Sequence, residues 1–277
     1  MPVTGPTVTR RQLARRLRAL RDAAGKSMTD MAAIKIMSVA KLYRIESGTT
    51  AVKISDVWAL CRVYGADDKT TDALAGLAAA SNDKGWWHDY GDIMPADFEL
   101  YLGLEATATT IRIYEPERVQ GLLQTADYAR EIETATNMPP LGERGVERAV
   151  ALRMERQKTV LGKKPPSQIG VILGAGALAR RVGGPQTMAE QIERLRELSQ
   201  LDHVDVRVLP FSIGAHPAML GAFTLMEFKD PDDPPLAYVE TYSGARFIEE
   251  SEHLTRHRAV FDSIYQQAVP IEEYETA

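Results

Sequence analysis

Five short stretches of helical periodicity fill the first 80 residues, and this pattern favours a small all-α domain above any other fold. The first stretch runs from about Arg10 to Ala24, with Leu13, Leu17 and Leu20 on one helical face. Gly25 then ends it, because glycine readily takes the left-handed conformation that closes a helix.

Serines mark the starts of the next helices. Ser27 and Ser38 are the predicted N-caps of a second and a third helix, since their side chains can accept bonds from free backbone N–H groups. Ser55 is the predicted N-cap of a fourth helix, which Gly65 ends, and a fifth is expected from Asp67 to Ala80. Residues 1–80 therefore form a predicted helical domain.

The pattern changes after "SNDKG" at residues 81–85, and residues 81–277 are predicted to form a larger α+β domain with a mixed or antiparallel sheet. "VDVRVL" at 204–209 alternates apolar and charged residues as a half-buried strand does. Further strands are expected at 110–115, 169–173, 222–228 and 236–241. Helices are expected at Arg118–Glu133, Glu143–Leu161, Gln186–Leu201 and Glu252–Ala268, the last capped by Ser251.

Charge is distributed unevenly along the chain. Residues 1–80 hold 13 of the 33 Lys and Arg residues but only 7 of the 38 Asp and Glu residues. The remainder therefore holds 20 basic against 31 acidic residues. A basic N-terminal part on an acidic body indicates that the N-terminal part meets a polyanion.

Two features bear on the compartment. Cys61 is the single cysteine, so no disulfide can form within the chain. The longest apolar run, Ile169–Ala179, has 11 residues, far fewer than the roughly 20 that cross a bilayer. We expect a cytoplasmic protein that does not enter the membrane.

Three motifs with a chemical meaning are incomplete. "GAGALA" at 174–179 matches a phosphate-binding glycine pattern, but "GGP" at 183–185 should break the helix that such a site needs. "SVAK" at 38–41 lacks the companion motifs of penicillin-interacting enzymes. "HLTRH" pairs His253 with His257 without a third metal ligand. We therefore expect no catalytic residues, no metal site and no cofactor, and a protein that is not an enzyme.

The spacing between the Ser27 and Ser38 caps suits a helix-turn-helix, in which a short helix and a turn precede a helix that enters the major groove of DNA. Leu42 and Ile45, three residues apart, should face the core. Their burial would leave Val39, Ala40, Lys41, Tyr43 and Arg44 facing outward. A plain helical bundle with scattered lysines is the alternative.

A resemblance favours the helix-turn-helix. "GKSMTDMAAIKIMSVAKLYRIESG", followed by "ISDVWALCRVYG", resembles the Xre-type, lambda-repressor-like helix-turn-helix domain. The resemblance implies that Ser38–Glu46 is the recognition helix and that Ser27 and Met28 begin the helix that crosses the DNA backbone. It also implies that Arg44 and Glu46 serve partly as structural ion-pair partners.

The chain departs from that family at two places. Ile36 stands where the family usually has a glycine, so we expect a turn rebuilt with negative φ. "TTA" at 49–51 replaces the usual arginines, which predicts weaker backbone binding. The expected DNA-contacting residues are Ser27, Met28, Ser38, Val39, Ala40, Lys41, Tyr43, Arg44, Thr49 and Lys53.

The remainder resembles the long, antitoxin-like C-terminal domain of bacterial Xre-type regulators, through "GWWHDY", "YLGLEATATTIRIYEPERVQGLLQTADYAR", "VLPFSIGAH" and "GAFTLMEF". This implies a cytoplasmic transcription regulator whose C-terminal domain senses or binds something. The favoured hypothesis is a homodimer that binds double-stranded operator DNA and is modulated by a small molecule or small protein bound to the C-terminal domain. The alternative is an antitoxin-like module that sequesters a small partner, with DNA binding secondary. The residues considered for ligand or partner binding are Trp86, Trp87, Tyr114, Gln124, His216 and Tyr242.

Overall fold

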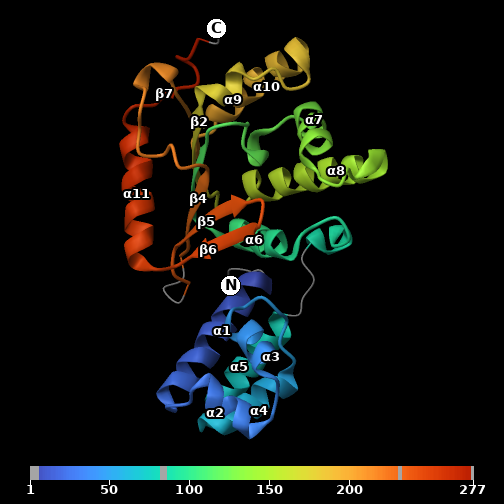
Figure 1. Ribbon diagram of the computed structural model, residues 1–277, viewed down its shortest axis with the longest axis vertical. Coiled ribbons are helices and arrows are strands. Elements are labelled where there is room, and N and C mark those ends of the chain that lie inside the picture. Colours follow the sequence, from blue (N-terminus) through green and yellow to red (C-terminus); the bar gives the residue numbers. More distant parts are fainter. Residues whose placement is uncertain (1–5, 82–85, 230–232, 276–277) are drawn as a thin grey trace. The chain divides into compact units, whose positions relative to one another are not determined.

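The computed structural model describes residues 6–81, 86–229 and 233–275 (Figure 1). The chain forms two compact units. The first holds residues 1–107 together with 230–233, and the second holds 108–229 together with 234–277. The expected domain boundary between residues 80 and 81 falls inside the first unit and next to residues 82–85, which lie outside the described residues. It stays a prediction about which segments fold independently.

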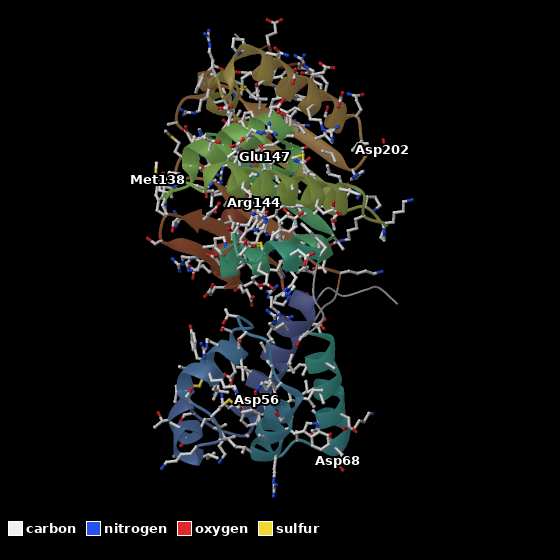
Figure 2. All side chains as sticks on the ribbon, turned by 90° about the vertical axis from the view of Figure 1, so that its right-hand side faces the viewer. Asp56, Asp68, Met138, Arg144, Glu147 and Asp202 are labelled. Atoms are coloured by element: carbon white, nitrogen blue, oxygen red, sulfur yellow. The ribbon has the colours of Figure 1, made fainter. Side chains whose placement is uncertain are left out.

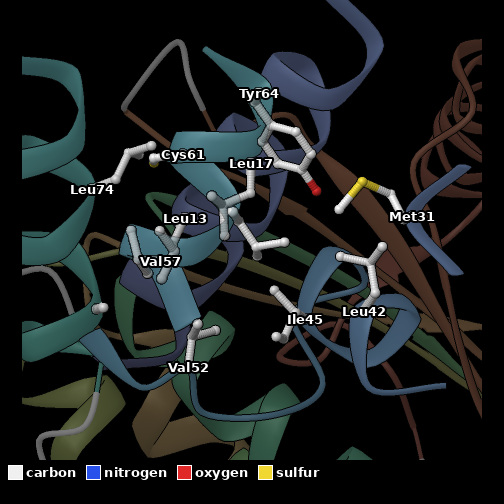
Figure 3. Close-up of a cluster of buried hydrophobic side chains, with 12 residues drawn as sticks. Leu13, Leu17, Met31, Leu42, Ile45, Val52, Val57, Cys61, Tyr64 and Leu74 are labelled. Carbon is white, nitrogen blue, oxygen red and sulfur yellow. The ribbon is translucent and has the colours of Figure 1, made fainter. Parts of the chain in front are cut away.

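The first unit begins with the five predicted helices. They are α1 (Pro6–Ala23), α2 (Met28–Ile34), α3 (Val39–Glu46), α4 (Ile54–Tyr64) and α5 (Asp68–Ala80), followed by the short η1 (Trp86–Tyr90) and by α6 (Ala96–Thr107). Neither η1 nor α6 was among the predicted helices. Leu13 and Leu17 of α1 pack with Leu42 and Ile45 of α3 in one fully buried cluster (Figure 3). The helical periodicity therefore predicted the core faces correctly.

The caps of α2 and α3 are confirmed. The Ser27 side chain accepts a hydrogen bond from the backbone of Asp30, whose carboxylate accepts one from the backbone of Ser27. The Ser38 hydroxyl accepts a bond of 3.2 Å from the backbone N–H of Lys41. The cap predicted at Ser55 is wrong, because α4 begins one residue before it. Lys53 is the N-cap there and makes no side-chain capping bond.

The turn between α2 and α3 keeps a left-handed residue, contrary to the expected turn of negative φ. Lys35 takes it, with φ of 58°, and Ile36 does not. The unbranched lysine tolerates this conformation better than a β-branched isoleucine. The chain thus places the positive φ one residue earlier and so spares Ile36 the strain.

Replacing Lys35 with glycine should raise the free energy of unfolding of the first unit by about 0.5–1 kcal/mol. Glycine removes the left-handed penalty of about 1–2 kcal/mol, and its greater freedom in the unfolded chain offsets part of that gain. Urea unfolding followed by circular dichroism measures the change. Ile36→Gly is the matched control and should destabilise, since no positive φ is relieved there. If Ile36→Gly stabilised the unit instead, Ile36 and not Lys35 would be the residue with the positive φ.

The second unit is built on a mixed sheet of seven strands, within the predicted fold class. The strand order is β6-β5-β4-β1-β2-β3-β7, with β1, β2 and β3 parallel and the other pairs antiparallel. The strands are β1 (Thr110–Glu115), β2 (Gln168–Gly174), β3 (Val204–Leu209), β4 (Phe223–Glu227), β5 (Leu236–Thr241), β6 (Gly244–Ile248) and β7 (Val269–Pro270). The predictions included the first five of these and missed β6 and β7.

Helices cover both faces of this sheet (Figure 1). Phe261 and Ile264 of α11 pack on one face, against Tyr114 of β1 and Ile172 of β2. On the other side of the sheet lie α7, α8 and α10. The helices of the unit are η2 (Gly121–Leu123), α7 (Ala126–Thr136), α8 (Gly142–Leu161), α9 (Ala175–Ala179), α10 (Gly184–Ser199), η3 (Phe211–Ile213) and α11 (Ser251–Tyr265).

Two expectations for this unit need correction. The helix predicted from Arg118 begins only at Ala126, because the Thr125 side chain caps it there and residues before it form η2 and loops. Ser251 is the first residue of α11 and not its cap, which is Glu250. A further expectation holds, since the short helix α9 ends after five residues at Ala179, ahead of the "GGP" segment.

Candidate nucleic-acid interface

Helix α3 presents one side to the core and the other to solvent. Leu42, Ile45 and Glu46 are buried, and successive helix residues are turned by about 100°. Ala40 and Arg44 therefore project most directly away from the core, with Val39 and Tyr43 on one flank and Lys41 on the other. This geometry is what a recognition helix requires, because its outer side is free to enter a groove.

The ten residues predicted to contact DNA lie at the surface to different degrees. Met28 and Lys41 are partly buried. The other eight are exposed: Ser27, Ser38, Val39, Ala40, Tyr43, Arg44, Thr49 and Lys53. Their role in binding DNA stays a prediction.

The outer side of α3 is largely apolar. Val39 is 42% exposed and Tyr43 is 66% exposed, and Ile36 in the preceding turn is exposed as well. We call Ile36, Val39, Ala40, Tyr43 and Arg44 the reading face. Sequence reasoning placed Val39, Ala40, Tyr43 and Arg44 here but not Ile36, which it treated only as a turn residue.

Lys41 is held by a partner that sequence reasoning missed. Its Nζ lies 2.7 Å from Oδ1 of Asp56. Asp56 is in the first turn of α4 (Figure 2). The Asp56 side chain is only 17% exposed, so the pair sits against the protein and not in open solvent. The cation that seemed free in the sequence is therefore neutralised in the folded unit.

Replacing Asp56 with asparagine should release Lys41 and raise affinity for any duplex by about 2–5-fold, the range of a partly exposed ion pair. The slope of log affinity against log salt should steepen by about 0.9 if Lys41 then neutralises one phosphate. Fluorescence anisotropy with a labelled duplex at several salt concentrations measures both. Asp68→Asn is the control, since Asp68 also lies in the first turn of a helix, α5 (Figure 2). Equal effects from both variants would contradict the prediction.

A buried ion pair fixes α3 to α1. Nε and Nη2 of Arg21 lie 2.8 and 2.9 Å from the two carboxylate oxygens of Glu46. Arg21 also donates from Nη1 to the carbonyl of Lys26. The hydrogen bond to Glu46 raises the pKa of Arg21 above its usual value. Glu46 is thus the structural partner that the resemblance implied, whereas the exposed Arg44 has no ion pair within the described part of the chain.

The six residues considered for ligand binding do not form one site. Trp86 and Trp87 belong to the first unit, where their rings meet edge to face at 5.6 Å and Trp87 is buried. Tyr114 and His216 do lie together in the second unit, with ring centroids 6.0 Å apart. Gln124 is buried elsewhere and donates to the carbonyl of Val119.

Tyr242, the sixth candidate, is fully exposed in the turn between β5 and β6. It makes no ring contact with Tyr114 or His216 among the contacts of the described residues. The candidates of the second unit therefore comprise one close pair and two separate residues.

Sequence reasoning also missed a charged cluster beyond the end of β1. Arg118 lies 3.7 Å from Glu115 and 3.2 Å from Glu240, and Arg153 of α8 pairs with Glu133 of α7. Burial raises the pKa of Glu115 to about 6, against the opposing charge of Arg118. Burial likewise lowers the pKa of Arg153 to about 10. Oppositely charged side chains are interleaved here, so the cluster is balanced in sign.

Neither a membrane span nor a metal site is found in the described ranges. No helix there combines the length and apolarity that crossing a bilayer needs. Nor do His, Cys, Asp and Glu side chains in those ranges gather in a group of three that could hold a metal ion.

Two family models match the chain. The first, described as a domain of unknown function (DUF5753), matches residues 98–274. The second, described as a helix-turn-helix domain, matches residues 12–74, which contain α2, α3 and the turn between them. Neither the curated proteins nor the solved structures include a match to this chain. The helix-turn-helix match supports a DNA-binding regulator of transcription.

Proposed function

The chain belongs to the DUF5753 family and carries a helix-turn-helix domain, and from this we propose that it is a sequence-specific transcriptional regulator of the Xre type. The observation that carries the proposal is the outer side of α3. That helix is capped by Ser38, anchored by Leu42 and Ile45, and leaves the reading face open to solvent. Side chains in such a position can reach base edges in the major groove.

We further propose that the protein acts as a homodimer and that its C-terminal unit receives a small molecule or a small protein. Two copies would present two recognition helices to a two-fold operator, with half-sites about one helical turn apart. An effector bound to the second unit would then change the spacing or freedom of the two helices. The Tyr114–His216 pair and the charged cluster around Arg118 are the polar features of that unit to probe first.

A second candidate function, antitoxin-like capture of a small protein, has support of its own. Exposed apolar side chains follow β3, namely Phe211, Met219 and Leu220, the last 92% exposed. The β5–β6 turn, which carries Tyr242, leaves the same edge of the sheet, because β4 is antiparallel to β1 and to β5. Apolar groups gathered at one edge are typical of protein contact surfaces.

Selection from a random-sequence duplex library tests the regulator directly. The full chain should enrich one motif, and the enriched duplex should bind at least about 1,000-fold more tightly than unselected DNA at physiological salt. Sedimentation of the complex should give two chains per duplex, and the motif should be two-fold symmetric. A library that yields no enriched motif would refute the sequence-specific function, and one chain per duplex would refute the dimer.

Co-expression with small proteins encoded beside this gene tests the second candidate. A complex that survives purification and that is lost on Leu220→Asp, with DNA binding unchanged, would support capture through this edge. Leu201→Asp is the matched control, since Leu201 is also an exposed leucine of the second unit. If both variants lost the complex equally, capture through this edge of the sheet would be contradicted.

A further inference from the structure

The reading face has an unusual chemistry for a DNA-contacting surface. Ile36, Val39 and Ala40 offer only hydrocarbon, and Tyr43 adds an exposed aromatic ring with a hydroxyl at its tip. Polar base edges gain no hydrogen bond from the three aliphatic side chains or from the face of the ring. An apolar side chain pressed against guanine or adenine acceptors takes their water without replacing its hydrogen bonds.

Cations contribute less to this face than the sequence implies. Asp56 neutralises Lys41 at 2.7 Å and draws it toward α4. Arg44 projects from the side of α3 opposite the buried Leu42 and Ile45, and it is exposed. Among the described residues of α3, it is the cation left to meet a base or a phosphate.

Thymine carries the apolar group that fits this surface. Its C5-methyl is the hydrocarbon group that the major groove displays, whereas guanine, adenine and cytosine present hydrogen-bonding edges there. We infer that the reading face selects half-sites rich in thymine, which Ile36, Val39, Ala40 and Tyr43 recognise through the methyl groups, with Arg44 as its contact to a single guanine. This rests on the proposed sequence-specific DNA binding and names the class of operator.

The test replaces thymine with deoxyuridine in the duplex selected from the random library. Deoxyuridine pairs as thymine does but lacks the methyl group. Replacing each contacted thymine should lower the affinity of the protein for the duplex about fourfold, the value of one buried hydrocarbon group. The salt dependence of binding should stay unchanged. Deoxyuridine outside the half-sites should change nothing.

Two variants connect the lost affinity to the reading face. Val39→Ala and Tyr43→Ala should weaken binding to the thymine duplex but have little further effect on the deoxyuridine duplex, because the methyl contact is then already missing. Ile54→Ala is the matched control, since Ile54 is an exposed aliphatic residue of α4 outside the reading face. It should weaken binding to neither duplex.

The outcomes separate this inference from the function on which it rests. An enriched motif that lacks thymine, or that tolerates deoxyuridine throughout, overturns the inference and leaves sequence-specific binding intact. A library without any enriched motif overturns the function itself. If Val39→Ala and Tyr43→Ala instead abolish self-association of the chain in the absence of DNA, this face is an interface between copies and the inference is wrong.

Discussion

Replacing Glu46 with alanine should lower the free energy of unfolding of the first unit by about 3–5 kcal/mol, because it removes the buried counter-charge of the Arg21 guanidinium and leaves only the exposed Asp22 beside it. Arg21 and Glu46 are both buried, and two hydrogen bonds of 2.8 and 2.9 Å join them. Tyr64 lies close by, and its pKa is raised by burial and by the negative charge of Glu46. The pair holds α3 in place, so the reading face should lose its order together with it.

Asp22→Ala provides the matched control for this prediction. Asp22 also lies 2.8 Å from Arg21, but its side chain is 57% exposed. An exposed partner of this kind contributes only about 0.2–1 kcal/mol. Urea unfolding of the full chain, with hydrogen exchange of the α3 amides as a local readout, measures both variants. If Glu46→Ala lowered the free energy of unfolding no more than Asp22→Ala, the Arg21–Glu46 pair would not anchor α3.

The double variant Arg21→Met with Glu46→Leu distinguishes two effects on stability. One is the loss of the ion pair, and the other is the cost of leaving a buried charge without its partner. Two apolar side chains of similar volume remove both desolvated charges, so much of the stability should return. The remaining deficit should reflect the bond from Arg21 to the carbonyl of Lys26, which the double variant also removes.

Local signals explain why the helices of the first unit could be predicted. Leu13, Leu17, Leu42 and Ile45 recur at helical spacing, and a spacing in sequence becomes a shared face without any knowledge of the tertiary structure. The failure at Ser55 has the opposite cause. A serine within the first turn and a serine at the N-cap look alike in sequence, and only the backbone angles distinguish them.

In the second unit, too, local patterns were predicted correctly and features that depend on other contacts were not. Strand β3 alternates buried and partly exposed residues as predicted, because the alternation is a local property of a half-covered strand. The segment from Arg118 to Gln124 looks helical, yet the Gln124 side chain bonds to the carbonyl of Val119 and competes with helix formation. Strand β6 was missed because none of its residues is buried, so it carries no apolar alternation, and it forms by pairing with β5 across a turn.

Contacts between distant residues account for what was missed at the candidate interface. The outward residues of α3 follow from its periodicity, so most of the reading face could be predicted. The pairing of Lys41 with Asp56 could not, because it depends on how α3 packs beside α4. That pairing neutralises the lysine of the predicted surface and leaves it largely apolar, which changes the DNA that it suits.

Replacing Ala40 with glutamate should lower the affinity for the selected duplex by about 100-fold or more. Ala40 projects directly away from the core, so a carboxylate there would face phosphates and the acceptor edges of purines. The variant should lose one or two base contacts, at about 1–3 kcal/mol each. This loss and the repulsion between the carboxylate and the phosphates together give the expected 100-fold decrease. Anisotropy titration at fixed salt measures the change.

Unfolding cannot account for such a loss. Ala40 is the second residue of α3, and a glutamate in the first turn interacts favourably with the helix dipole. Ala40→Gln keeps the size without the charge and should lose much less. Ala73→Glu, at an exposed alanine of α5, places the same charge elsewhere on the unit and should change affinity by less than about threefold, the effect of one screened surface charge. If Ala73→Glu weakened binding as strongly as Ala40→Glu, the loss would reflect net charge alone, and α3 would not be the helix that reads the DNA.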